Sequence, residues 1–375
     1  MREKRQRQGE VAGLGQLLAL HDGSLDVRMV ETHASWVFLT ARSAWKRKKI
    51  PPLALPSEIA QDPGRRLCEE ELRLNQRLSP SVYLGVVPLF RSPHGELQLA
   101  PEGEPADWLL HMRRLPDERS LEALLRSTGV SPREMDGLGR TIADFHARCQ
   151  PIALAPAVYR SRLLRSIKAD RKALLHLHYR LPRAAVEHLF CLLHGEARRL
   201  SPQLAGRVRD GHVIEGHGDL RAEHVYLTEP IEIIDCLDFS QVLRTQDGAD
   251  EAGFLALECE RFGARSAARR LLHGYLRARH DAISQQLLNF YQACRACTRA
   301  RLALAHLDEA RYRYQKRWRL RALDYLALAA AHSARHPRSH GYGLRLAAPG
   351  RAEGRPRPRP RRTATVWPRA QPGAA

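Results

Sequence analysis

Alternating apolar and polar residues dominate the first third of the chain, and this period of two is typical of strands with one buried face. The stretches with this pattern are residues 27–31, 36–40, 44–48, 86–90, 96–100 and 107–113. Turn residues such as those at 92–95, Ser-Pro-His-Gly, join neighbouring stretches. We therefore predict an antiparallel sheet of five or six strands.

Helical periodicity replaces this alternation beyond residue 116. An apolar stripe over residues 138–149 predicts one helix. Further helices are predicted at residues 160–178, 182–200, 264–279, 282–307 and 312–334, with a loop and a helix at 244–262. A small sheet followed by many helices predicts an α+β chain, which at 375 residues has ample material for a core.

One helix, predicted at residues 65–78, interrupts the strands and carries a carboxylate on its apolar stripe. Glu71 falls in line with Leu67, Leu74 and Leu78. A buried carboxylate needs a cation beside it, and the candidates are Lys48 and Lys46, which share one face of the third stretch by the period of two. The simpler alternatives are that Glu71 reaches water at the edge of the stripe and that the lysines only protect a solvated strand end.

Most candidate catalytic groups lie in one short segment, residues 214–239. A His-Gly-Asp tripeptide at 217–219 precedes an alternating run, a Thr-Glu-Pro turn and a second run that ends on Asp235. The pattern predicts a loop and a hairpin that returns Asp235 to the end where Asp219 lies. Two carboxylates at the same end of the hairpin indicate a binding site for a divalent metal ion and a phosphate group. His-Gly-Asp is also a common turn in which the aspartate caps the next element.

The hairpin and the lysine strand together resemble the aminoglycoside phosphotransferase branch of the protein-kinase-like fold, often found as the N-terminal part of longer ATP-binding proteins. The resemblance implies two lobes, a small antiparallel N-lobe and a large, mainly helical C-lobe. It implies that Asp219 and His217 of the loop are catalytic residues, with Asp219 orienting and deprotonating an acceptor hydroxyl, and that Asp235 binds magnesium. Where the family has asparagine this chain has His224, so either Asp235 holds the magnesium ion largely by itself or the imidazole favours a softer ion, with Mn²⁺ as the second choice of metal.

The same resemblance implies roles for residues outside the hairpin. Lys48, with Lys46 as second choice, would contact the phosphates of ATP and pair with Glu71. The last strand, which includes Met112, would run into the hinge whose backbone binds adenine. After the hairpin, two carboxylates match positions that support the catalytic loop and would favour a cationic acceptor such as an aminosugar: Asp247 and Asp250. Helix N-termini attract carboxylates in any case.

The net charge of +20 raises the question of a nucleic-acid partner. Residues 335–375 hold ten arginines against one acid, Glu353, and are rich in proline and glycine. Such a tail is predicted to be disordered. It can touch nucleic acid or anionic lipid without specificity, although a merely solvated tail is the simpler interpretation. No specific nucleic-acid partner is predicted.

Other sequence features exclude several classes of protein. No apolar run is long enough to span a membrane, and the first residues are charged where a secretory signal would be apolar. Seven scattered cysteines suit free thiols in a reducing compartment, so a cytoplasmic location is predicted. The Cys-x-x-Cys at 294–297 lies in a helical pattern without a second pair and is interpreted as structural. A P-loop is excluded because its Gly-Lys-Ser/Thr motif is missing.

The leading hypothesis is an ATP- and magnesium-dependent phosphotransferase acting on a hydroxyl of a small molecule, such as an aminoglycoside, another sugar or an amino alcohol. Its predicted parts are an extension at 1–23, an N-lobe at 24–116, a C-lobe with the hairpin at 117–334 and the tail at 335–375. One alternative is an impaired nucleotide-binding or scaffold module, suggested by His224 and the absence of a glycine-rich loop. The other is a metal-dependent phosphohydrolase with the ligands His212, His217, Asp219, His224 and Asp235.

Overall fold

The computed structural model describes residues 2–49, 62–101 and 105–334, with side chains described from residue 9 onward. The chain divides into two compact units. The first comprises Met1–Val130 and His217–Arg244, and the second Ser131–Gly216 and Thr245–Ala375. In this division the hairpin groups with the sheet, whereas the sequence places it in the helical lobe; the lobe boundaries remain a prediction. The tail at 335–375 and the proline-rich stretch at 51–56 lie outside the described residues.

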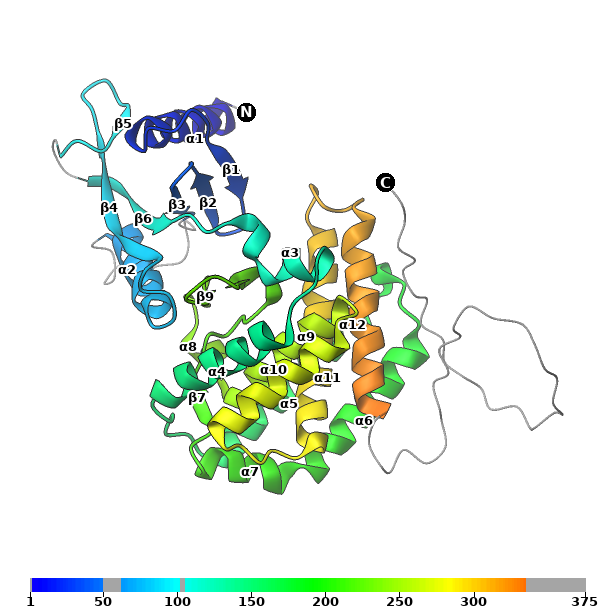
Figure 1. Cartoon of the computed structure of the whole chain (residues 1–375). Helices are drawn as coiled ribbons and strands as arrows, with labels where there is room; N and C mark the ends of the chain where they lie inside the picture. The colour runs from blue at the N-terminus through cyan, green and yellow to red at the C-terminus, as the bar shows by residue number, and fades with distance from the viewer. Residues whose placement is uncertain (1, 50–61, 102–104, 335–375) are drawn as a thin grey trace, which may run out of the picture. The chain divides into compact units, whose positions relative to one another are not determined.

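A six-stranded antiparallel sheet is the framework of the first unit (Figure 1). Its strands follow the order β1-β2-β3-β6-β4-β5. Their bounds are β1 (Arg28–Glu31), β2 (Ser35–Leu39), β3 (Ser43–Lys48), β4 (Tyr83–Arg91), β5 (Leu97–Gln98) and β6 (Pro105–Arg113). Each predicted stretch overlaps one of these strands, because alternation reports directly which residues face a core.

A helix packs on each face of this sheet. On one face lies α1 (Arg2–His21), which buries Val11, Leu14 and Leu18 against the sheet. Those three residues have helical spacing, i, i+3 and i+7. The sheet contributes Phe38, Trp45, Leu89 and Leu109 to this core. Residues 1–23, predicted only as an extension, therefore supply a helix to the core of the unit.

The opposite face of the sheet receives α2 (Pro63–Gln76). Leu110 and Met112 of β6 pack there with Cys68 of α2. Since successive residues of a strand point to opposite faces, Trp45 of β3 points to α1, while Lys46 and Lys48 point to α2. The two lysines therefore meet the helix that carries Glu71.

The remaining elements of the first unit are short. They are η2 (Asp117–Arg119), α3 (Leu121–Arg126), η4 (Ala222–His224), β8 (Val225–Tyr226), β9 (Glu232–Ile233) and α8 (Gln241–Arg244). Antiparallel pairing of Val225 with Ile233 closes the predicted hairpin.

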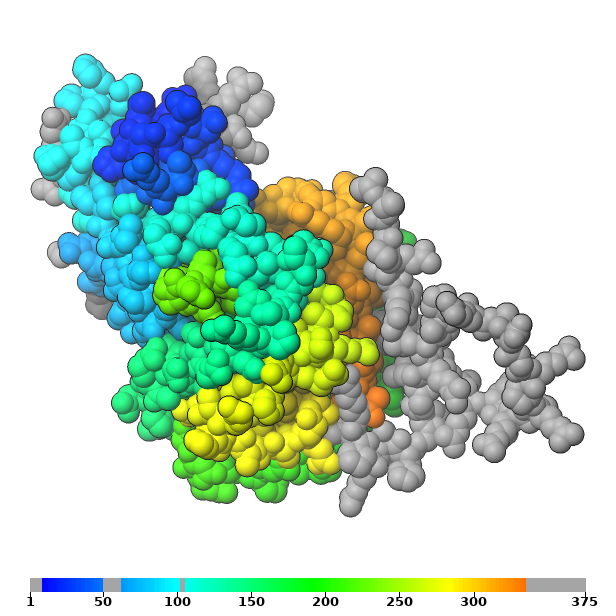
Figure 2. All heavy atoms as spheres, viewed as in Figure 1, coloured from blue at the N-terminus to red at the C-terminus, as the bar shows by residue number. Residues whose placement is uncertain are grey.

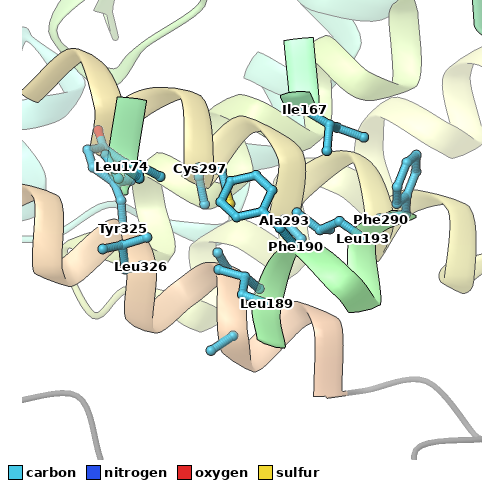
Figure 3. Close-up of a cluster of buried hydrophobic side chains, with 14 of the residues drawn as sticks. Ile167, Leu174, Leu189, Phe190, Leu193, Phe290, Ala293, Cys297, Tyr325 and Leu326 are labelled. Atoms are coloured by element: carbon cyan, nitrogen blue, oxygen red, sulfur yellow. The ribbon is translucent and has the colours of Figure 1, made fainter. Parts of the chain in front are cut away.

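The second unit is mainly helical. Its helices are α4 (Pro132–Arg148), α5 (Pro156–Leu174), η3 (Leu177–Tyr179), α6 (Arg183–Arg199), α7 (Ser201–Arg209), α9 (Gly248–Arg261), α10 (Arg265–Arg279), α11 (Gln285–Ala305), η5 (His306–Asp308) and α12 (Lys316–Ala334). Two short strands, β7 (Val213–Glu215) and β10 (Thr245–Asp247), pair antiparallel. Its core includes Phe190, Phe290 and Tyr325 (Figure 3). Within the described ranges, no helix is both long enough and apolar enough to cross a bilayer.

The crossing of α4 and α10 is close enough to require glycine. A Cβ atom at Gly139 would lie 2.6 Å from the carbonyl oxygen of Leu271 and 2.7 Å from the backbone nitrogen of Tyr275. We expect Gly139→Ala to lower the free energy of unfolding by about 2 kcal/mol, because backbone atoms must move apart. Urea unfolding measures this value.

Gly195→Ala is the matched control for Gly139→Ala. Gly195 lies within α6, is exposed, and has no atom within 4 Å of its added Cβ. This change should stabilise the protein slightly, by about 0.5–1 kcal/mol, because alanine favours a helix more than glycine does. Equal effects of the two substitutions would contradict the proposed clash.

Candidate active site

Loop 217–219 is shaped by a glycine and a buried histidine. Gly218 has a φ of +89°, and a Cβ there would lie 2.9 Å from Cβ of Leu237, so both conformation and space call for glycine. His217 is fully buried. Its Nε2–H donates to the carbonyl oxygen of Ile234 at 2.8 Å, and its Nδ1 accepts from the backbone N–H of Asp219 at 3.3 Å.

These contacts bear on the catalytic role that the sequence suggests for His217. Both ring nitrogens are engaged with backbone, and the ring lies beneath the loop rather than at its surface. His217 therefore fastens the loop of Asp219 to the exit of the hairpin, next to Asp235.

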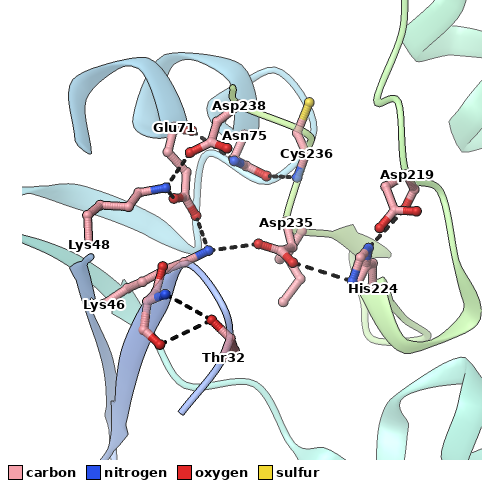
Figure 4. Close-up of polar contacts among 12 residues, drawn as sticks. Thr32, Lys46, Lys48, Glu71, Asn75, Asp219, His224, Asp235, Cys236 and Asp238 are labelled. Atoms are coloured by element: carbon pink, nitrogen blue, oxygen red, sulfur yellow. Dashed lines mark hydrogen bonds and ion pairs between the residues drawn. The ribbon is translucent and has the colours of Figure 1, made fainter. Parts of the chain in front are cut away.

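A lysine bridges α2 and the hairpin exit. Nζ of Lys46 lies 2.8 Å from Oε1 of Glu71 and 2.8 Å from Oδ1 of Asp235 (Figure 4). Burial opposes the charge on Lys46, but the two carboxylates outweigh it and hold the pKa of the ammonium well above its ordinary value. Partial burial opposes the charge on Asp235, and Lys46 overrides this effect, so that the pKa of the carboxyl falls well below its ordinary value.

Lys48 forms a second bridge beside the first. Its Nζ contacts Oε2 of Glu71 and Oδ2 of Asp238 (Figure 4). Glu71 therefore pairs with both lysines. Its side chain is 1% exposed, as its place on the buried stripe predicts. The lysines differ in their second partner: Lys46 contacts the predicted metal ligand Asp235, and Lys48 contacts Asp238. The sequence ranks Lys48 first for the phosphates, but the contact with Asp235 belongs to Lys46.

Asp235 is held in an uncommon backbone conformation. Its φ is 61°, in the left-handed region that few residues other than glycine adopt. Its N–H donates to the hydroxyl of Tyr83 at 3.0 Å, and the N–H of Cys236 donates to Oδ1 of Asn75 at 2.8 Å. Even so, 47% of the Asp235 side chain is exposed. These contacts hold the backbone of Asp235 in place while its carboxylate stays accessible to a ligand.

An arginine that the sequence did not suggest lies beside the predicted base. Nε of Arg221 donates to Oδ2 of Asp219 at 2.9 Å, and the side chain of Asp219 is 23% exposed. Arg221 also contacts Glu223. The only signal in the sequence is a basic residue two positions after Asp219, in a loop where many residue types occur.

His224 takes the tautomer that a metal ligand requires. Its Nδ1–H donates to the carbonyl oxygen of Asp219 at 2.9 Å, and its Nε2 accepts from Nη2 of Arg221 at 3.1 Å. Nε2 lies 3.4 Å from Oδ2 of Asp235. One imidazole nitrogen and one carboxylate oxygen thus lie close together, and a metal ion on Nε2 would take the place of the N–H of Arg221. This mixed donor set fits Mn²⁺ better than Mg²⁺, which prefers oxygen ligands.

Replacing His224 by asparagine should change the metal preference of the protein. With His224→Asn we expect the ratio of Mg²⁺- to Mn²⁺-supported activity to rise about tenfold, since an oxygen replaces the nitrogen donor. Initial rates measured over a range of each metal test this. His188→Asn, at an exposed position on α6, is the control and should leave the ratio unchanged, and an unchanged ratio in His224→Asn would argue against imidazole ligation.

The remaining predicted site residues, Met112, Asp247 and Asp250, have surroundings that differ from those of Asp219 and Asp235. Met112 is buried in the core between the sheet and α2. Asp247 is fully buried, with its oxygens 2.6 Å from Nε and Nη2 of Arg207. Asp250 is bound by Nε and Nη2 of Arg295 at 2.9 and 2.8 Å. Since both carboxylates are occupied by arginines, their contacts describe a structural role and lend no support to the substrate role.

Among the residues that the structure describes, no three histidine, cysteine or acidic side chains form a metal-binding cluster. The predicted phosphohydrolase, with five residues as metal ligands, gains no support from this result. Cys294 and Cys297 are free thiols whose pKa values burial raises well above the ordinary value. Thiols in that state are poor nucleophiles and ligands, consistent with a structural role.

Comparison of the sequence with known proteins finds relatives without a described function. No model of a known protein family matches the chain. Proteins of Mycobacterium tuberculosis and Mycobacterium bovis, named only as uncharacterized, are 28% identical over 301 residues, which cover 76% of this chain and 56% of theirs. The chain thus spans about half the length of these curated relatives.

Solved structures of small-molecule kinases share the fold. A choline/ethanolamine kinase family protein from Mesorhizobium loti matches with a TM-score of 0.50 and 15% identity, covering 88% of this chain and 96% of that one. A spectinomycin phosphotransferase bound to AMP matches with a TM-score of 0.46 and 11% identity, covering 87% and 98%. The two-lobed, kinase-like α+β fold that the resemblance implies is therefore confirmed.

Proposed function

We propose that this chain transfers the γ-phosphate of ATP to a hydroxyl group of a small molecule with the help of a divalent metal ion. The observation that carries the proposal is the double contact of Lys46, with Glu71 on α2 and with Asp235 at the hairpin exit. In kinase-like phosphoryl transfer, a lysine held by a glutamate contacts the phosphates beside a metal-binding aspartate. The fold shared with small-molecule kinases agrees with this chemistry.

Each group then has a defined task. Lys46 binds the phosphates of ATP, and Glu71 orients it. Asp235 and Nε2 of His224 would hold the metal ion, which would neutralise phosphate charge when bound. Asp219 orients the acceptor hydroxyl and takes its proton, and His217 keeps the loop of Asp219 in place. Such catalysis consists mainly of positioning and charge stabilisation.

The acceptor belongs to the hydroxylated, nitrogen-containing small molecules. We propose this class because the neighbour from Mesorhizobium loti is a choline/ethanolamine kinase family protein and because the hairpin resembles that of aminoglycoside phosphotransferases. Asp247 and Asp250 are not assigned to its recognition, since arginines occupy them.

Nucleotide binding and turnover test the function in two steps. A thermal-shift titration with ATP and either Mg²⁺ or Mn²⁺ should raise the melting temperature in a metal-dependent way. ATP consumption is then followed with choline, ethanolamine, sugars and aminoglycosides as acceptors. If ATP binds but is not consumed with any of the acceptors, the impaired nucleotide-binding module is favoured. If ATP causes no thermal shift with either metal, the ATP assignment is refuted.

The two lysines of β3 should differ in importance. We expect Lys46→Met to lower kcat by about 100-fold, the scale for loss of a central electrostatic group. Lys48→Met should have a smaller effect, because Lys48 contacts Asp238 in place of Asp235. Steady-state kinetics with a responsive acceptor, together with ATP-induced thermal shifts, measure both. A larger loss in Lys48→Met would transfer the phosphate-binding role to Lys48.

A further inference from the structure

A hollow of about 320 Å³ opens on the second unit at the crossing of α4 and α10. Figure 2 shows atoms of these two helices at the surface of that unit. None of the predicted catalytic residues lines the hollow. Its lining consists of Asp136, Arg140, Arg270, His273, Gly274, Arg277 and Ala278.

Residue spacing explains why basic side chains gather here. On α10, Arg270, His273 and Arg277 lie at i, i+3 and i+7 and so share one face. On α4, Asp136 and Arg140 lie at i and i+4. The helices approach so closely that a Cβ on Gly274 would lie 3.1 Å from the carbonyl oxygen of Asp136. The long side chains that flank this crossing therefore surround one space, and the small residues Gly274 and Ala278 complete its lining.

The charges around this hollow do not balance. Nε of Arg270 lies 2.9 Å from Oδ2 of Asp136. Arg140 and Arg277 are exposed, and among the described residues neither has an ion-pair partner. Three arginines thus face one carboxylate, which Arg270 already engages. The hollow keeps two guanidinium groups available for an anion.

From this arrangement we infer that the hollow between α4 and α10 is a binding site for a small phosphate-bearing anion. A guanidinium group donates two parallel hydrogen bonds to a phosphate, and arginines on two helices can approach one phosphate from two sides. A volume of about 320 Å³ lies at the small end of the range for ligand sites, which suits a phosphate ester of low molecular mass. The inference does not depend on the proposed kinase activity.

This site binds its ligand without transforming it. The lining offers Asp136 and His273 as groups that exchange protons, and Asp136 is paired with Arg270. Neither a nucleophilic hydroxyl or thiol nor a cluster of carboxylates for a metal is among the lining residues. Recognition of the phosphate group is the only chemistry that these side chains support.

Isothermal titration calorimetry on the full chain tests the inference with two probes, inorganic phosphate and glycerol 3-phosphate. We expect saturable binding of at least one probe, and the stronger of the two tells free phosphate from a phosphate ester. The double variant Arg140→Gln/Arg277→Gln should weaken binding at least about tenfold, since it removes two charge-assisted contacts. Asp136→Asn should strengthen binding, because it removes the acidic group from the lining.

Two control proteins make the result specific. Arg133→Gln/Arg269→Gln removes two exposed arginines from the same two helices, outside the lining, and should leave the affinity unchanged. Lys46→Met should also leave it unchanged, which separates this site from the nucleotide site. Absence of saturable binding of both probes, or an equal loss in the Arg133→Gln/Arg269→Gln protein, would overturn the inference.

Discussion

Replacing Asp235 by alanine is expected to lower the rate of ATP-dependent phosphoryl transfer by about 100- to 1,000-fold. The carboxylate is half exposed, sits on a backbone of positive φ and contacts Lys46. Its removal takes away the predicted oxygen ligand of the metal and one of the two anchors of Lys46. Initial-rate measurements of kcat/KM give the loss, and the metal-dependent thermal shift with ATP should disappear as well.

Asp238→Ala is the matched control for Asp235→Ala, because Asp238 pairs with the neighbouring lysine, Lys48, at the same hairpin exit. It leaves the contact between Lys46 and Asp235 intact and should lower the rate by less than about tenfold. Unfolding curves of both variants exclude loss of the fold as the cause. An active Asp235→Ala protein, or equal losses in the two variants, would show that Asp235 has no special role.

Replacing Arg207 by methionine is expected to lower the free energy of unfolding by about 3–5 kcal/mol. Arg207 of α7 donates to both oxygens of Asp247 at 2.6 Å and to those of Asp281 at 2.5 and 2.7 Å. Both carboxylates are buried. Without the guanidinium group they keep their desolvation cost and lose the cation that offsets it. Urea denaturation at neutral pH measures the difference.

The pH dependence of Arg207→Met separates this cause from simple loss of packing. In the unaltered protein burial favours protonation of Asp281, but Arg207 overrides it, so the pKa is lowered. Its stabilising effect is thus present above the ordinary pKa and is lost as the pH falls. In the variant the strongest opponent of burial is gone and only His212 and the backbone N–H of Ile283 still favour the charged form, so the pKa of Asp281 rises and protonation relieves the penalty. The difference in unfolding free energy between Arg207→Met and the unaltered protein should therefore become smaller as the pH falls to about 4.

The control for Arg207→Met is Arg209→Met, which removes an exposed arginine from the same helix. This change should alter the unfolding free energy by no more than about 0.5 kcal/mol. A gap between Arg207→Met and the unaltered protein that stayed constant with pH would show that lost packing, and not unpaired charge, is responsible.

Local sequence patterns were enough to locate the strands of the sheet and most of the long helices, and the faces on which their residues lie. Period-two alternation located the strands and placed Lys46 and Lys48 on one face, and helical spacing placed Glu71 on the buried stripe of α2. Local chemistry also identified the hairpin, because His-Gly-Asp, the alternation and the turn all act over a few residues. The helix α1 carried a similar signal in Val11, Leu14 and Leu18, which the charged start of the chain obscured.

Which of these groups meet became known from the folded chain alone. Periodicity specifies a face but not a distance, so it could not tell that Lys46 reaches Asp235 while Lys48 reaches Asp238. Nor could it show that Arg207 forms a buried ion pair with Asp247. Such contacts join residues far apart along the chain. They depend on how strands, helices and loops pack, and packing is a property of the whole fold.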